Sequence, residues 1–187
     1  MIQATDRDSR RATLDWAGPA LWAGALGGLV KILYLSAASW VLGAGFWTPV
    51  NMAGATFEPF APPAIDFELL PSLTGMGLHI ATCAVWGLVF GALVMRRPGL
   101  LGSAAKTTLA GLGLGLAFAV TAYVIGSFFN PYSAGINPLL GYIPPLVGNL
   151  LFGLVTAYAL RAGLRRNTLT ITMAPEQPVA AEDRQLR

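Results

Sequence analysis

Four long apolar runs dominate this sequence, at residues 20–46, 73–95, 107–129 and 143–164. A helix needs roughly 20 apolar residues to cross about 30 Å of hydrocarbon, so each run is long enough to form a span. Only 11% of the residues are charged, whereas a soluble domain usually carries about 25%. The sequence therefore predicts an all-α integral membrane protein, a bundle of four transmembrane helices.

Charged residues and prolines mark the ends of these runs. Arg96 and Pro98 follow the second run, Pro131 follows the third, and Arg165 follows the fourth. Proline cannot continue a helix, and arginine resists entering lipid. We expect a transmembrane domain over residues 20–166, an N-terminal tail at 1–19 and a C-terminal tail at 167–187. Within that last tail, residues 168–172 alternate as a short strand does.

The positive charges are distributed unevenly between the segments that connect the runs. Segments 47–72 and 130–142 contain no Lys or Arg, and the first of them is acidic. Apart from Lys31, the basic residues lie in or beside the two tails and the segment after the second run: Arg7, Arg10, Arg11, Arg96, Arg97, Lys106, Arg161, Arg165, Arg166, Arg184 and Arg187. Cytoplasmic segments carry such an excess, so we expect both termini in the cytoplasm and the protein in a bacterial inner membrane.

The net charge of +3 therefore indicates topology, with lipids and other membrane subunits as partners and no nucleic acid. Residues 9–14 also resemble a twin-arginine export signal. The long apolar run that follows favours a retained span instead.

Small residues are dense within the runs, and they allow helix backbones to approach closely in lipid. We expect helix contacts at Gly24, Gly28, Gly87, Gly91, Gly111, Gly115 and Gly148. The segments at 47–72 and 130–142 are rich in proline and aromatic residues, and the prolines disfavour regular structure there. These segments either pack over the bundle or form a docking surface for another protein.

Three polar residues inside the runs are candidates for function, because polar groups are costly in lipid. Lys31 lies roughly 16 Å into the first run at 1.5 Å per residue, and no acidic residue lies inside any run. It either serves a function, pairs with an acidic residue of another subunit, or reaches toward the cytoplasm. His79 and Asn149 are expected at similar depth, and a hydrogen bond between them, or a similar contact between helices, is the simplest structural role.

The sequence also leaves cofactor binding open at His79. Met76, His79 and Cys83 are spaced to share one helix face, and their sulfur and imidazole groups suit copper. A haem or chlorophyll-type pigment is a further alternative, with Met52 as an opposite ligand to haem. No cofactor is predicted outright. The sequence contains no catalytic motif of the common hydrolase or nucleotide-binding types, so we do not expect an enzyme.

Residues 20–166 resemble the YagU-like group of four-helix bacterial inner-membrane proteins. The residues that carry the resemblance are 25–31, His79 with 86–91, and 148–153. No established activity accompanies that group. We therefore expect a non-catalytic accessory subunit of a larger respiratory or photosynthetic membrane complex. The alternative is a small homo-oligomeric transporter or channel that uses Lys31, and the third hypothesis is a carrier of haem, pigment or copper at His79.

Overall fold

The computed structural model describes residues 16–55, 64–129 and 140–173, and these residues form helices with no strand among them. The elements are α2 (Ala17–Val41), α3 (Thr48–Gly54), α4 (Leu69–Arg96), the 3-10 helix η2 (Pro98–Leu101), α5 (Ala104–Phe129) and α6 (Ile143–Met173). The four long helices are long and apolar enough to cross a membrane. The all-helical fold with four candidate spans is thereby confirmed, and it suggests a multi-pass membrane protein.

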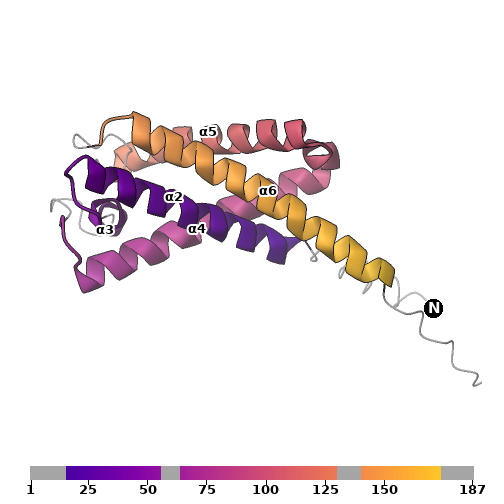
Figure 1. Ribbon diagram of the computed structural model, residues 1–187, viewed down its shortest axis with the longest axis horizontal. Helices are drawn as coiled ribbons and strands as arrows, with labels where there is room; N and C mark the ends of the chain where they lie inside the picture. The colour runs from indigo at the N-terminus through magenta and orange to yellow at the C-terminus, as the bar shows by residue number, and fades with distance from the viewer. Residues whose placement is uncertain (1–15, 56–63, 130–139, 174–187) are drawn as a thin grey trace, which may run out of the picture.

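Successive long helices run in opposite directions along the long axis of the bundle (Figure 1). α2 and α6 are central: α2 packs against α4 and α6, and α6 packs against α5. The start of α2, the connection between α4 and α5, and the end of α6 lie at one end of the bundle. α3 lies at the opposite end, which we call the α3 end.

Local hydrogen bonds explain where α2 ends. The Gly43 amide donates to the backbone carbonyl of Trp40, and the Ala44 amide donates to the backbone carbonyl of Ser39. This pair of bonds is the Schellman arrangement of a helix C-terminus. Gly43 has φ +77°, a conformation that glycine adopts without steric cost. The chain therefore turns sharply at this point and can enter α3.

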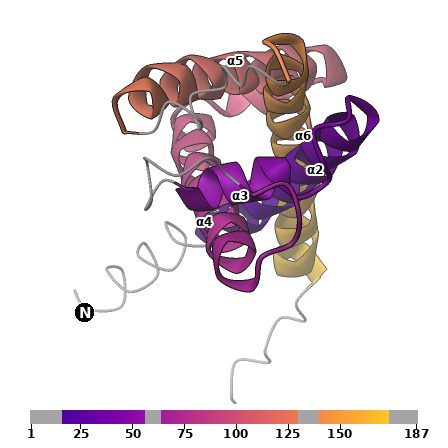
Figure 2. The ribbon, with the colours of Figure 1, turned by 90° about the vertical axis from the view of Figure 1, so that its left-hand side faces the viewer.

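The segment at 47–72 contains regular structure that the sequence analysis did not expect. Pro49 lies in the first turn of α3, and Pro71 lies in the first turn of α4. The first amides of a helix have no partner within the helix, so proline is tolerated there. α3 packs against α4 and α2, and it lies across the end of the bundle that faces the viewer in Figure 2. The described part of this segment thus packs on the bundle, and residues 56–63 and 130–139 lie outside the described residues.

One asparagine fixes α3 to the chain on either side of it. The Asn51 Nδ2 group donates to the carbonyls of Ala64 and Asp66, both at 2.8 Å. The Ser72 hydroxyl donates to Asn51 Oδ1 at 2.7 Å. The Asn51 side chain is almost fully buried, so its carboxamide lies away from solvent, where an unpaired polar group is costly. We call this set the Asn51 clip.

Residues 168–172 alternate as a short strand does, but they lie in α6, which continues to Met173. A strand there would need a neighbouring strand to satisfy its backbone groups. Extending a helix that has already formed adds one hydrogen bond for each residue fixed, so the helix continues past Arg166.

Glycines form the closest contacts between the long helices. A β-carbon added at Gly24 or Gly28 would collide with Cys83 of α4, and one added at Gly87 or Gly91 would collide with Ala20 of α2. A β-carbon added at Gly111 or Gly115 would meet the backbone of α6, and one added at Gly148 would meet the Leu35 side chain of α2. All seven glycines singled out in the sequence therefore lie at contacts between helices.

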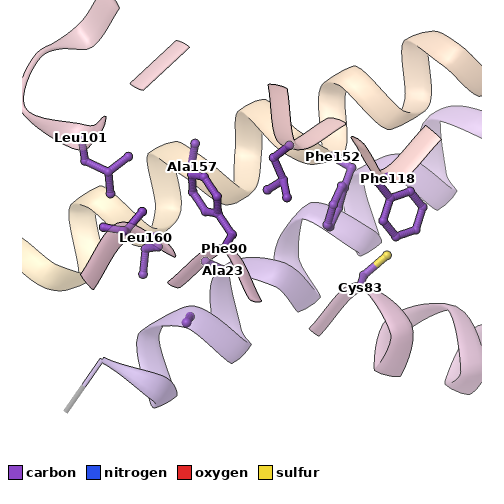
Figure 3. Close-up of a cluster of buried hydrophobic side chains, with 11 residues drawn as sticks. Ala23, Cys83, Phe90, Leu101, Phe118, Phe152, Ala157 and Leu160 are labelled. Atoms are coloured by element: carbon purple, nitrogen blue, oxygen red, sulfur yellow. The ribbon is translucent and has the colours of Figure 1, made fainter. Parts of the chain in front are cut away.

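Larger side chains fill the interior between these contacts. Figure 3 shows Phe118, Phe152 and Cys83 gathered at one end of the apolar cluster, away from Leu101 and Leu160. The rings of Phe118 and Phe152 lie 4.8 Å apart, and Trp86 packs edge-on against Phe118 at 5.5 Å. Phe118 therefore joins α5 to both α4 and α6 in the centre of the bundle.

Candidate functional site: a polar cavity inside the bundle

A cavity of about 130 Å³ brings together side chains from every long helix and from α3. Its polar residues are Lys31 of α2, His79 of α4 and Asn149 of α6. Pro49 and Met52 of α3 and Tyr123 of α5 complete the wall, together with smaller apolar residues. We call this space the polar cavity. The three polar residues that the sequence indicated separately inside its apolar runs thus line one space.

Lys31 is the charged member of the polar cavity. Its side chain is only 8% exposed, and its Nζ lies 4.2 Å from the centroid of the Phe118 ring. The described part of the chain contains two acidic residues, Asp66 and Glu68, and both are exposed and lie outside the long helices. Among the described residues, an aromatic face is therefore the partner of this ammonium group, and no carboxylate pairs with it.

An aromatic face alone does not offset the burial of a charge. A cation over an aromatic ring gains about 2 kcal/mol when it is desolvated, whereas removing an ion from water costs several kcal/mol. The ring also covers only one side of the ammonium group. Lys31 is therefore poised to bind an acceptor or an anion on the side that faces the polar cavity.

His79 makes a contact between two helices. Its Nε2 donates to the backbone carbonyl of Gly28 at 3.2 Å. This bond joins α4 to α2 about one helical turn before Lys31. A β-carbon at Gly28 would also collide with the Cys83 side chain, so glycine is required for this approach. The Cys83 sulfur lies 3.8 Å from His79 Nε2.

The specific hydrogen bond expected between His79 and Asn149 is wrong. His79 donates to Gly28 instead, which is the helix-to-helix polar contact expected in kind but with a different partner. Asn149 is 7% exposed, and its Oδ1 has no hydrogen-bond partner. The two residues lie at the same cavity but do not bond to each other. The buried Oδ1 acceptor of Asn149 is therefore left without a donor among the described residues.

The structure also places the residues proposed for cofactor binding. It brings Cys83 and His79 together, but the described residues contain no group of three or more His, Cys, Asp or Glu side chains that could hold a metal. Met52 and His79 line the same cavity, yet its volume is well below the roughly 300–1,000 Å³ of pockets that hold drug-sized ligands. The polar cavity therefore has the size for a small solute rather than for a haem or chlorophyll ring.

Sequence reasoning did not identify Phe118 or the contribution of α3 to the site. Phe118 is one of nine phenylalanines, and no pattern in the sequence distinguishes it from an ordinary core residue. Pro49 does carry a signal, because a proline that follows a polar residue is typical of a first helical turn. That signal is compatible with the start of a helix but does not by itself predict α3, and it says nothing about the cavity.

The fold and the polar cavity together define a class: a helical bundle with four candidate membrane spans and a small polar cavity among them. Comparisons of this chain with protein families, with curated proteins and with solved structures find no match. The function is therefore inferred from the polar cavity itself.

Proposed function

We propose that this chain is a small transporter or channel, and that the polar cavity is its solute-binding site. The observation that carries the proposal is that Lys31, His79 and Asn149, from three different spans, line one cavity. Polar and ionisable residues inside a membrane domain commonly mark the path of an ion or substrate. The cavity lies on the same side of the bundle as α3, so a solute would approach it beside this short helix.

The arrangement of α3 supports this proposal. Transporters often place a substrate site where a helix is interrupted, because the irregular backbone then lines a cavity instead of facing lipid. Here the chain leaves α2 through a glycine turn, forms α3 and re-enters the bundle as α4. Pro49, Met52 and Ala53 of α3 form part of the cavity wall. α3 therefore acts as the outer wall of the site.

A flux measurement tests the proposal. Purified protein would be reconstituted into liposomes, and swelling would be followed by light scattering after mixing with sodium chloride, sodium propionate, propionamide or glycerol. We expect protein-dependent entry of at least one of these solutes, and at least a tenfold loss with Lys31→Met. Lys106→Met is the matched control, because Lys106 is the only other lysine and is exposed at the start of α5. Flux that is absent for all four solutes, or equal in both variants, would contradict the proposal.

The accessory subunit of a larger membrane complex, which the sequence favoured first, stays a prediction. Native mass spectrometry of gently solubilised membranes distinguishes the two functions. A stoichiometric catalytic partner would support the accessory subunit, whereas an assembly of this chain alone would support the transporter or channel. The resemblance to the YagU-like group also stays a prediction.

A further inference from the structure

The polar cavity has a chemistry that selects among small solutes. Among the residues that the structure describes, Lys31 supplies the only charged group of the cavity wall, and no carboxylate neutralises it. A solute that completes the site therefore supplies one negative charge. A dianion would leave one charge unpaired in a buried site, and a cation would be repelled by Lys31.

The second polar contact comes from Asn149, across the cavity on α6. Its carboxamide is buried, and Oδ1 has no partner among the described residues. The same carboxamide carries an NH₂ group, which can donate a hydrogen bond to an anion. A carboxylate has two oxygens, so one can accept from Lys31 and the other from Asn149, whereas a halide offers a single centre.

Apart from Tyr123, the rest of the wall is apolar. Ile32, Leu35, Met52, Ala122 and Leu140 all line the cavity. These side chains offer no partner to a second polar group on the solute, but they do gain from contact with a hydrocarbon chain. The volume of about 130 Å³ admits several water molecules or one solute with a few carbon atoms.

We infer that the polar cavity binds a short-chain monocarboxylate, with its carboxylate held by Lys31 and Asn149 and its alkyl chain against the apolar wall. This inference names the solute class of the proposed transporter or channel, and it rests on that function. His79 contributes by holding α4 to Gly28 of α2, next to Lys31, so it is a positioning residue here.

Calorimetry on the full-length protein in detergent tests the solute class with propionate and propionamide. The two molecules have nearly the same shape and differ in charge. We expect propionate to bind at least about tenfold more tightly than propionamide, because a hydrogen bond to a charged group is worth about ten- to a hundredfold in affinity. Affinity is also expected to rise from formate to acetate to propionate, by about fourfold for each CH₂ group. Equal binding of propionate and propionamide would overturn the inference, and so would chloride binding as tightly as propionate.

Variants assign the two polar contacts. Lys31→Met is expected to remove the preference for propionate over propionamide, and Lys106→Met is expected to retain it. Asn149→Leu is expected to weaken propionate binding about fivefold and to leave propionamide binding unchanged. Should Lys31→Met fail to fold, Asn149→Leu still decides, because unchanged propionate affinity in that variant would overturn the assignment of the carboxylate to this cavity.

Binding and flux separate this inference from the proposed function. Flux of glycerol or chloride that depends on Lys31, without propionate binding, would overturn the solute class and leave the transporter or channel standing. Propionate binding that depends on Lys31, without flux of any solute, would overturn transport and leave the ligand class standing.

Discussion

The pair formed by Lys31 and Phe118 is the most unusual feature at the scale of single residues. The ammonium group of α2 lies 4.2 Å from the centroid of a ring on α5, although these two helices are not neighbours in the bundle. The ring is itself held between Trp86 and Phe152. Packing therefore fixes the position of the Phe118 ring, and the ring presents its face to the Lys31 ammonium group.

A double-mutant cycle measures this contact directly. We expect Lys31→Met and Phe118→Leu to show a coupling energy of about 1–2 kcal/mol, because each single change removes the same cation–π interaction. The free energy of unfolding would be measured by denaturant titration in mixed micelles. Phe118→Leu combined with Lys106→Met is the control and should be additive within about 0.5 kcal/mol. Additive effects of Lys31→Met and Phe118→Leu would show that the contact contributes nothing to stability.

The Asn51 clip leads to a second prediction about single residues. Asn51→Ala removes three hydrogen bonds and leaves the Ala64 and Asp66 carbonyls and the Ser72 hydroxyl without this partner. Since each unsatisfied buried group costs about 1–3 kcal/mol, we expect a loss of at least about 2 kcal/mol in stability. Ser72→Ala removes one of the three bonds and also the bond that the Ser72 hydroxyl accepts from the Glu68 amide, so it should cost less than Asn51→Ala. The melting temperatures of the two variants in detergent, relative to the unchanged protein, check this order.

If α3 is the wall of the polar cavity, Asn51→Ala should also weaken propionate binding, although Asn51 is not among the cavity-lining residues. Full affinity in that variant would show that the site forms without a fixed α3.

At the scale of elements, the four long helices were predictable because length, hydropathy and terminal residues all indicate them independently. α3 was not, because prolines in an apolar segment can break a helix or begin one, and only their position in the first turn decides. The polar residues were also identifiable one by one, since any polar group in an apolar run stands out. Their pairing was not predictable, because counting residues from a helix end gives the depth of His79 and Asn149 but not their rotation about the helix axes.

The glycines of α5 allow a sharp test of helix packing. A β-carbon at Gly115 would meet the backbone of Asn149 and Leu150, whereas one at Gly113 would meet nothing within 4 Å. Overpacking a close contact costs about 1–3 kcal/mol. In an open position, alanine favours a helix over glycine by about 1 kcal/mol. We therefore expect Gly115→Ala to lower the free energy of unfolding and Gly113→Ala to leave it unchanged or raise it.

Denaturant titration in mixed micelles measures both α5 variants against the unchanged protein. A Gly115→Ala protein as stable as Gly113→Ala would contradict the close packing of α5 on α6. Because both changes add one methyl group to the same helix, an effect of the methyl group on the detergent environment would appear in both.

At the scale of the whole molecule, basic and acidic residues are separated along the long axis of the bundle. Apart from Lys31, the basic residues of the described part lie at or toward the ends of helices: Arg96 and Arg97 at the end of α4, Lys106 at the start of α5, and Arg161, Arg165 and Arg166 in the C-terminal half of α6. Figure 1 places these helix ends at the end of the bundle opposite α3. Asp66 and Glu68 precede α4 and lie at the α3 end. The bundle therefore has a basic end and an acidic end, joined by apolar helices.

This polarity predicts the orientation of the protein in its membrane. The positive-inside rule places the basic end in the cytoplasm, so the start of α2 and the end of α6 face inward and α3 faces outward.

Introduced cysteines test the orientation, because Cys83 is the only natural cysteine and is fully buried. We expect an impermeant maleimide added to intact spheroplasts to label Asp66→Cys at the α3 end. Gly99→Cys, in the connection between α4 and α5, should be labelled only after the membrane is permeabilised. Both positions are exposed, so a difference between them reports the side of the membrane. Labelling of Gly99→Cys alone in intact spheroplasts would invert the topology, and the polar cavity would then lie nearer the cytoplasm.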